Sequence, residues 1–432
     1  MTAPSHPPFS RSLLLGLSSI ALLSSCSIVD RLTDRSKGDR AFIAYWPPPE
    51  GDTRLRLAVK DNIDMKGLVT SAGSEYLSKN SRPAKRDAPC LAIARQRNVV
   101  IVGKANLSEF AVAPSGVNEF FGTPDNPLNG WWRKRIPGGS SSGSAVAVAT
   151  GMADVAFGTD TAGSVRVPAA CTGVVGLKTT FGLISTDGIH PIEPKHLDTV
   201  GPLGKDIART VQGMDLLQNG FAGRYASATA AKPSGAGIRI GRLTLPGTDP
   251  DIDQAIDQAL SAAGFQVVRL DENFRAKWDQ AKKDGNTVAA AGAWISDKQF
   301  RGDFGVSTRT KTTILAGQLA YNTGYKEALS KQKAWQRTLR RVFAKVDFIA
   351  LPTIQSTVPA MPPDLKIGIF EAVMLDIQNT VPANFGGIPA LAMPIPLKHS
   401  SVDVTSLQLL GPPRSEAELL NAGRLVEAAV KR

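Results

Sequence analysis

The chain is poor in the residues from which most hydrolytic, redox and metal sites are built. It contains four histidines, at positions 6, 190, 196 and 399, and three cysteines, at positions 26, 90 and 171. No CxxC or HExxH pattern occurs, and Cys90 and Cys171 lack the spacing of metal ligands. The sequence therefore predicts no metal, no organic cofactor and no disulfide framework.

Internal repeats and low-complexity tracts are also absent, which excludes solenoid and fibrous architectures. Apolar residues make up 42% of the 432 residues and charged residues 20%, as in a globular protein with a sizeable core. The formal net charge of +12 fits a soluble basic surface, or attraction to anionic lipid or cell-wall polymers. The basic residues are scattered and form no stripe interleaved with aromatics, so no nucleic-acid partner is predicted.

The N-terminal segment resembles an export signal. Arg11 precedes an apolar stretch, Leu13 to Leu23, that is too short to span a bilayer and has the proportions of a signal-peptide core. The LSSC run at 23–26 resembles a lipobox, in which the cysteine is lipidated. The alternative is an ordinary secreted signal with an incidental cysteine.

These features predict how the N-terminus is processed and where the protein is located. We expect a signal peptide over residues 1–25, a lipid anchor on Cys26 and a polar tether over residues 26–40. The expected location is the cell envelope, in the periplasm. The outer membrane is favoured, because Ser27 rather than aspartate follows the cysteine.

The rest of the sequence alternates strand-like and helix-like stretches. Short apolar runs bounded by turn residues predict strands, and longer runs predict helices. Strands are expected at 98–103, 238–243, 265–270 and 347–354, and helices at 88–96, 143–153, 249–263 and through most of 271–345. The alternation predicts an α/β fold with a single large domain over 41–430, in which residues 211–345 form a variable, mostly helical middle.

Two glycine-rich segments carry serines, and a lysine ends a strand upstream of them. PGGSSSGSA at 137–145 contains Ser140, and GTDTAGSVRVPA at 158–169 contains Ser164. LRLAVK at 55–60 alternates like a strand and ends on Lys60. No histidine lies in these segments, so a serine hydrolase site built here is expected to use a lysine base.

Together with their surroundings, these motifs resemble the amidase signature family, serine hydrolases that cleave amide bonds with a Ser–cis-Ser–Lys triad. The likeness extends to AVKDNIDMKGLVTSAGS at 58–74, FGTPDNP at 121–127, TGVVGLKTTFGLIS at 172–185 and NFGGIPALAMPIPL at 384–397. It implies a central mixed β-sheet covered by helices on both faces. It also implies an amidase in which Ser164 forms an acyl-enzyme, Ser140 follows a cis peptide bond and relays protons, and Lys60 is the base.

A role as base requires an uncharged lysine. Moving the pKa of Lys60 from about 10.4 to about 7 opposes roughly 4–5 kcal/mol of charging preference, which burial away from carboxylates supplies. Asp61 and Asp64 are close in the sequence, so both must point away from the amine. Otherwise Lys60 forms an ordinary ion pair.

The resemblance implies an oxyanion hole formed by the backbone N–H groups of Thr161, Ala162, Gly163 and Ser164. The family usually has glycine at the position of Ala162. Alanine retains the N–H donor as long as its φ angle is negative.

Other residues of the two loops are expected to support the site. By resemblance, Asp160 orders the loop through hydrogen bonds and Arg166 pairs nearby. Ser141 is expected to bond to Lys60 or to the loop backbone. Ser142 is a second departure, because the family usually has glycine there.

Three other functions remain compatible with the sequence. GSSSG at 139–143 matches the nucleophile elbow G-x-S-x-G, with Ser141 as nucleophile and His190, His196 or His399 as base. The departures at positions 142 and 162 allow a lipoprotein that kept the fold but binds rather than cleaves. The serine loops also resemble the glutamine-hydrolysing subunit of a tRNA-dependent amidotransferase.

The substrate cannot be read from these motifs. A small-molecule or peptide amide is expected, and the loops within 211–345 and 359–385 are expected to line its pocket. The oligomeric state stays open.

Overall fold

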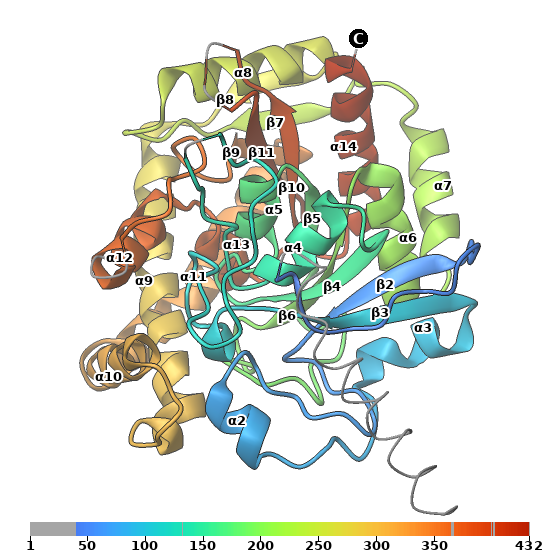
Figure 1. The fold of residues 1–432 in the computed structure, drawn as a ribbon. Helices are drawn as coiled ribbons and strands as arrows, with labels where there is room; N and C mark the ends of the chain where they lie inside the picture. Colours follow the sequence, from blue (N-terminus) through green and yellow to red (C-terminus); the bar gives the residue numbers. More distant parts are fainter. Residues whose placement is uncertain (1–39, 132, 364–366, 399, 401, 432) are drawn as a thin grey trace, which may run out of the picture.

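The computed structural model describes residues 40–131, 133–363, 367–398, 400 and 402–431. The predicted signal peptide, Cys26 and nearly all of the predicted tether lie outside the described residues. Within them, the chain forms one large β-sheet between two layers of helices (Figure 1).

The sheet has eleven strands among the described residues, in the order β1-β3-β2-β4-β6-β5-β10-β11-β9-β7-β8. Strand β2 pairs in parallel with β3 and β4, and β7 pairs in parallel with β8 and β9. The other pairings are antiparallel, so the predicted mixed sheet is confirmed. The strands are β1 (Phe42–Tyr45), β2 (Leu55–Lys60), β3 (Val99–Ala105), β4 (Val155–Asp160), β5 (Val175–Lys178), β6 (Thr199–Gly204), β7 (Arg239–Arg242), β8 (Gln266–Arg269), β9 (Phe348–Pro352), β10 (Ala390–Pro396) and β11 (Val404–Leu410).

Helices cover both faces of this sheet (Figure 1). They are α2 (Glu75–Asn80), α3 (Ala92–Gln96), α4 (Ser142–Ala149), α5 (Arg166–Thr172), α6 (Ile207–Leu217), α7 (Phe221–Ala231), α8 (Pro250–Ala262), α9 (Glu272–Asp297), α10 (Thr308–Thr323), α11 (Tyr325–Phe343), α12 (Ile367–Ile377), α13 (Val381–Gly386) and α14 (Glu416–Val430). Three short 3₁₀ turns occur at Pro89–Leu91, Glu109–Ala111 and Lys298–Phe300.

The alternation of side chains along the strands separates the core into two faces. On β2, Leu57 and Val59 belong to a core shared with α6, α8 and α14. Ala58 points the other way and packs with the small residues of α4. Ile349 and Leu351 of β9 pack with α9, α11 and α13. The helices of each layer are therefore held by every second residue of the strands.

The middle of the chain extends the same sheet. The strands predicted at 238–243, 265–270 and 347–354 correspond to β7, β8 and β9, and the helix predicted at 249–263 corresponds to α8. The helical run predicted at 271–345 is divided into α9, α10 and α11. Because β7 to β9 continue the sheet that contains β2 and β4, the predicted single large domain is confirmed.

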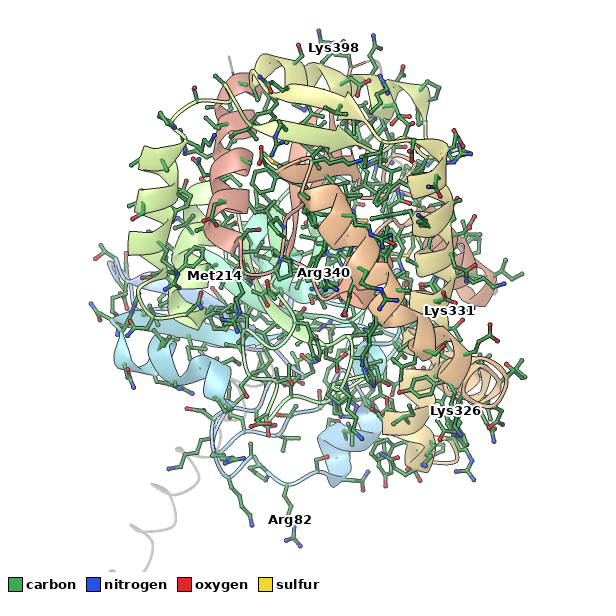
Figure 2. All side chains as sticks on the ribbon, turned by 180° about the vertical axis from the view of Figure 1, so that it is seen from behind. Arg82, Met214, Lys326, Lys331, Arg340 and Lys398 are labelled. Atoms are coloured by element: carbon green, nitrogen blue, oxygen red, sulfur yellow. The ribbon has the colours of Figure 1, made fainter. Side chains whose placement is uncertain are left out.

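Helix α11 illustrates how the outer layer is fixed. Trp335 and Leu339 are buried on its inner face, whereas Lys326, Lys331 and Arg340 lie along the helix in the view from behind (Figure 2). This amphipathic pattern holds α11 against the core and gives it a basic outer face.

Candidate active site

Lys60 and the two serines meet at one edge of the sheet. Lys60 ends β2, and Asp160 ends its parallel neighbour β4. Parallel strands end at the same edge, so the segments that follow them lie side by side. Ser140 stands just before α4, which packs against both strands, and Ser164 lies in the turn between β4 and α5.

The amine of Lys60 is held between two hydroxyl groups. Its Nζ lies 2.8 Å from the Oγ of Ser140 and 2.8 Å from the Oγ1 of Thr159. The peptide bond between Gly139 and Ser140 is cis. The side chain of Lys60 has no exposed surface. The lysine and the first serine are therefore in direct hydrogen-bond contact inside the protein.

The two neighbouring acids point away from the amine, as a neutral lysine requires. Asp61 forms an ion pair with Lys104 at 2.9 Å, and Asp64 accepts a hydrogen bond from Thr70 at 2.6 Å. Burial lowers the pKa of Lys60 to about 7, although the negative charges of Asp160 and Asp198 act in the opposite direction. Near neutral pH a substantial fraction of this amine is uncharged.

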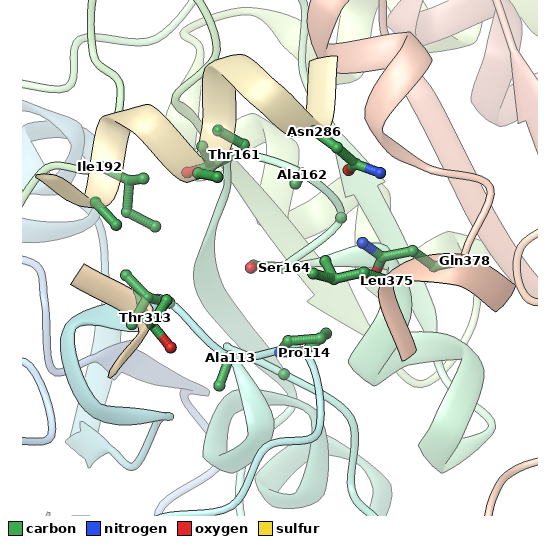
Figure 3. A pocket seen from close by; sticks show the side chains of 17 residues that line it. Ala113, Pro114, Thr161, Ala162, Ser164, Ile192, Asn286, Thr313, Leu375 and Gln378 are labelled. Atoms are coloured by element: carbon green, nitrogen blue, oxygen red, sulfur yellow. The ribbon is translucent and has the colours of Figure 1, made fainter. Parts of the chain in front are cut away.

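Ser164 lies in the pocket, with its Oγ directed inward (Figure 3). The N–H of Ser141 donates to the carbonyl oxygen of Ser164 at 3.2 Å, which ties the two serine loops together. No hydrogen bond joins the Oγ atoms of Ser140 and Ser164 among the described residues. Such contacts are often long before a substrate binds.

Asp160 organises the nucleophile loop from a fully buried position. It accepts hydrogen bonds from the N–H groups of Gly163 and Val165 at 2.9 and 3.1 Å. It pairs with Arg166 at 2.9 Å, and both side chains are fully buried. Burial alone raises the pKa of Asp160, but the charges of Arg166 and Lys178 and the hydrogen bonds hold it at about 2. Asp160 is thus a permanent anion around which the loop folds.

The N–H groups of the loop divide into two sets. The Gly163 N–H donates to Asp160 and is therefore not free to act in the oxyanion hole, the role that had been predicted for it. Within the described part of the chain, no hydrogen bond engages the N–H groups of Thr161, Ala162 or Ser164. These three donors are the ones available to a developing negative charge.

The two departures from the family pattern fit the backbone. Ala162 and Ser142 are absent from the non-glycine residues with positive φ, so alanine and serine are accommodated without strain at those positions. Gly163 takes the special conformation instead, with φ of +135°. A side-chain carbon built there would lie 2.3 Å from the Oγ1 of Thr380. The loop needs glycine at 163 rather than at 162.

Ser141 and Asp198 brace the two loops from behind. The Oγ of Ser141 donates to the Thr159 carbonyl at 3.4 Å and makes no bond to Lys60. Asp198 accepts from the Oγ1 of Thr161 at 2.7 Å and from the N–H of Ile192 at 2.9 Å. Burial raises the pKa of Asp198. The carboxylate fixes the start of the nucleophile loop.

Sequence reasoning did not assign roles to Thr159, Asp198, Thr380 or Asn384. The Oγ1 of Thr380 donates to the Ala162 carbonyl, and Asn384 donates to Asp160 at 2.9 Å. These partners are 218 and 224 residues apart in the sequence. The resemblance of NFGGIPALAMPIPL to a family segment was the available signal for Asn384, and Thr380 had none.

The histidine-based alternative receives no geometric support. Ser141 is fully buried and does not line the pocket that contains Ser164. His190 forms a pair with Asp297 at 2.9 Å and stacks on Phe110. His399 lies outside the described residues. A nucleophile at Ser141 would have no open path to a substrate.

The pocket has a volume of about 120 Å³ and a mostly apolar wall. Figure 3 shows Ser164 at its centre, with side chains from α9, α10 and α12 around it. The lining residues are Ala111, Val112, Ala113, Pro114, Gly139, Thr161, Ala162, Gly163, Ser164, Ile192, Asn286, Ala289, Ala290, Ala293, Thr313, Leu375 and Gln378. None of these described residues is charged. Residues within 211–345 and 359–385 were predicted to line the pocket, and the lining residues from these ranges lie on α9, on α10 and at the end of α12.

The chain is similar over most of its length to curated proteins. It is 32% identical over 418 residues to the A subunit of the glutamyl-tRNA(Gln) amidotransferase of Symbiobacterium thermophilum, covering 86% of this chain and 83% of the relative. It is 35% identical over 396 residues to a 2-amino-5-chloromuconic acid deaminase of Comamonas testosteroni, covering 87% and 81%.

The fold is also similar to that of solved structures. The A subunit of glutamyl-tRNA(Gln) amidotransferase from Thermotoga maritima matches with a TM-score of 0.72 and 25% identity, over 94% of this chain and 90% of that one. A structure of 6-aminohexanoate cyclic dimer hydrolase matches with a TM-score of 0.74 over 88% and 85%. At 23% identity, the latter likeness concerns the fold alone.

These relatives correct the predicted location. Several of them are named as subunits of an enzyme with a tRNA substrate, which contradicts a periplasmic lipoprotein. The prediction of a periplasmic location at the cell envelope is therefore wrong. It relied on a short apolar run and one cysteine, Cys26, in a segment outside the described residues. A separate observation is that no helix among the described residues is both long and apolar enough to span a bilayer.

Removing Arg166 should destabilise the fold strongly. Arg166→Met leaves the Asp160 carboxylate buried without its cation, so we expect a loss of about 3–5 kcal/mol in the free energy of unfolding. Urea denaturation measures this loss. Arg54→Met is the matched control, because Arg54 pairs with Asp52 at the surface and its loss should cost far less stability. Equal losses in the two variants would contradict the organising role of the Asp160–Arg166 pair.

A substitution at position 163 should reduce activity more than a substitution at position 162. We expect Gly163→Ala to lower kcat/KM on any accepted amide by at least about 100-fold, because the new carbon collides with Thr380 and the φ angle is unfavourable for alanine. Ala162→Gly should change kcat/KM by less than about fivefold. Amide hydrolysis assays on both variants, with thermal melts to verify folding, measure the difference. A larger loss of activity in Ala162→Gly than in Gly163→Ala would contradict the requirement for glycine at position 163.

The motifs, strands β2 to β11 and the pocket wall all fall within the match to one family. The family model described as Amidase matches residues 55–420, a range that contains Lys60, both serine loops and the pocket lining. The chain belongs to the amidase family.

Proposed function

We propose that this protein is an amidase that hydrolyses the C–N bond of a neutral carboxamide through an acyl-enzyme on Ser164, with Lys60 as base and Ser140 as proton relay. The observation that carries the proposal is the 2.8 Å contact between the Nζ of a fully buried Lys60 and the Oγ of Ser140. A lysine in this setting has a pKa low enough to accept a proton near neutral pH.

The acylation step follows from this arrangement. Neutral Lys60 takes the proton of Ser140 while Ser140 takes the proton of Ser164, and the Oγ of Ser164 forms a bond to the amide carbon. Negative charge then develops on the carbonyl oxygen, where the N–H groups of Thr161, Ala162 and Ser164 are available to it. The Lys60 ammonium returns its proton through Ser140 to the amide nitrogen, the C–N bond breaks and ammonia or an amine leaves.

Deacylation repeats the same proton path with water. Water gives one proton through Ser140 to Lys60 as its oxygen bonds to the acyl carbon. Lys60 then returns the proton to the Oγ of Ser164, and the carboxylic acid is released. No net proton remains on Lys60 after a turnover, which suits an amine that is sealed from solvent.

The pocket wall supports an uncharged substrate. A buried carboxylate or ammonium requires a partner of opposite charge, because burying an ion without one costs several kcal/mol. The described residues that line the pocket include none that is charged. The part of the substrate that enters this pocket is therefore neutral.

A second candidate is a glutamine-hydrolysing subunit, which the names of several relatives favour. Glutamine carries both an ammonium and a carboxylate group, for which the uncharged lining residues offer no partner. Ammonia release from glutamine at a rate above that from aliphatic amides would favour this candidate over the amidase.

The pH dependence of the reaction should report the ionisation of Lys60. The protonated form cannot accept a proton, so kcat/KM is expected to fall about tenfold per pH unit below pH 7 and to level off above it. Lys60→Met should lose at least about 1,000-fold in kcat/KM. Stopped assays between pH 5.5 and 9 measure the profile. A flat profile, or a methionine variant with full activity, would remove Lys60 from the mechanism.

The acyl-enzyme is tested by labelling and by a substrate panel. A serine-directed fluorophosphonate should label the wild-type protein on Ser164, as read by peptide mass spectrometry, and should not label Ser164→Ala. The wild type should release ammonia from members of an aliphatic and aryl amide panel, and Ser164→Ala should release none. Labelling on Ser141 would point to the nucleophile-elbow alternative. Absence of both labelling and turnover would favour a binding protein on the same fold.

A further inference from the structure

Two side-chain amides enter the pocket from outside the serine loops. Asn286 belongs to α9, and Gln378 directly follows α12. Figure 3 shows both on one side of Ser164, directed into the pocket, with Thr313 on the other side. The rest of the wall contributed by these helices is apolar, with Ala289 and Leu375 as examples.

The hydrogen-bonding capacity of these two amides is largely unused. The Oδ1 of Asn286 is buried and has no partner among the described residues. Gln378 is 2% exposed, and its side-chain amide makes no hydrogen bond within the described part of the chain. Thr313 differs, because its hydroxyl donates to the Arg309 carbonyl at 3.1 Å. A buried polar atom without a partner is destabilising, so a position such as the Oδ1 of Asn286 usually awaits a ligand or water. The amide of Gln378 lines the same pocket.

Both amides are mounted on rigid supports. The N–H of Gln378 donates to the Met374 carbonyl at 3.2 Å, and Gln378 forms an isolated β-bridge with Ile354. Beside Asn286, Gly285 lets α9 approach Val381 of α13 closely, where an added side-chain carbon would lie 3.0 Å from a Val381 methyl. The backbone at both positions is therefore fixed before any substrate arrives, which favours selective binding.

The chemistry of a side-chain amide defines what it binds. Each amide offers one carbonyl acceptor and two N–H donors. A second carboxamide or a urea in the substrate presents the complementary donors and acceptor. A simple alkyl chain would leave both amides unpaired. A carboxylate would present acceptors alone and would bring a charge into an uncharged pocket.

We propose that Asn286 and Gln378 form a subsite for a neutral amide or urea group in the non-reacting part of the substrate. The inference rests on the proposed amidase function and narrows it, because it assigns the substrate to carboxamides that carry a second neutral hydrogen-bonding group. The specificity of the enzyme then depends on α9 and α12, and the chemistry depends on the serine loops.

The test compares three amides of equal length. Pentanediamide carries a second amide, pentanamide ends in a methyl group, and 5-amino-5-oxopentanoate ends in a carboxylate. We expect wild-type kcat/KM for the diamide to exceed that for each of the others by at least about tenfold, since the diamide alone satisfies the hydrogen bonds of the two amides without bringing in a charge. Asn286→Leu and Gln378→Met, which keep side-chain size, should each lower the diamide-to-pentanamide ratio by about tenfold.

The exposed residue Asn322 of α10 provides the matched control, and Asn322→Leu should leave the ratio as in the wild type. An unchanged ratio in both Asn286→Leu and Gln378→Met, or a wild-type preference for the carboxylate substrate, would overturn the subsite.

Binding to the inactive Ser164→Ala protein separates this inference from the proposed function. Calorimetry should detect pentanediamide on Ser164→Ala, and binding should weaken about tenfold when Asn286→Leu is added. That result supports the subsite even in a protein that turns over none of the three amides. Fluorophosphonate labelling of Ser164 together with no diamide binding to Ser164→Ala would retain the nucleophile and reject the subsite.

Discussion

The site depends on one buried amine that forms no ion pair among the described residues. Lys60 ends a strand inside the protein, and its nearest polar contacts are the hydroxyl groups of Ser140 and Thr159. Asp61, the next residue in the chain, forms an ion pair with Lys104 instead. If that carboxylate turned toward Lys60, the amine would remain charged and could not accept a proton. Lys104 and Ser71 together hold the Asp61 carboxylate away from the amine.

A second buried pair fixes the nucleophile loop. Asp160 takes up the N–H groups of Gly163 and Val165 and is neutralised by Arg166. These bonds turn the loop so that the remaining N–H groups have no protein partner near Ser164 among the residues described. The positive charge of Arg166 also lessens the effect of Asp160 on the pKa of Lys60. One ion pair thus orders the loop and limits the electrostatic cost of placing an acid close to a neutral lysine.

The sequence predicted strands β2, β3, β7, β8 and β9 and several of the helices, because alternation and helical stretches are local patterns. That Lys60 and the two serine loops meet was implied by the resemblance to the family. It could not assign the Gly163 N–H to Asp160, since that bond depends on how Arg166 and Asn384 pack around the acid. Nor could it identify Asn286 and Gln378, which are ordinary polar residues in helical segments. Their significance arises from a pocket formed by elements far apart in the chain. The predicted location was wrong because a short apolar run and one cysteine at the N-terminus do not determine where a protein is located.

The pocket is formed by two separate parts of the fold. The reacting groups stand on β2, β4 and the serine loops, where the fold is fixed by the central sheet. The opposite wall comes from α9, α10 and α12, which pack outside that sheet. Exchanging Asn286 or Gln378 for a charged residue should alter the substrate charge preference and leave Lys60 in place, because no hydrogen bond joins either side chain to the triad among the described residues. Substitutions in the wall formed by α9, α10 and α12 can therefore change substrate specificity without altering the catalytic loops, provided that each new buried polar group has a partner in the substrate.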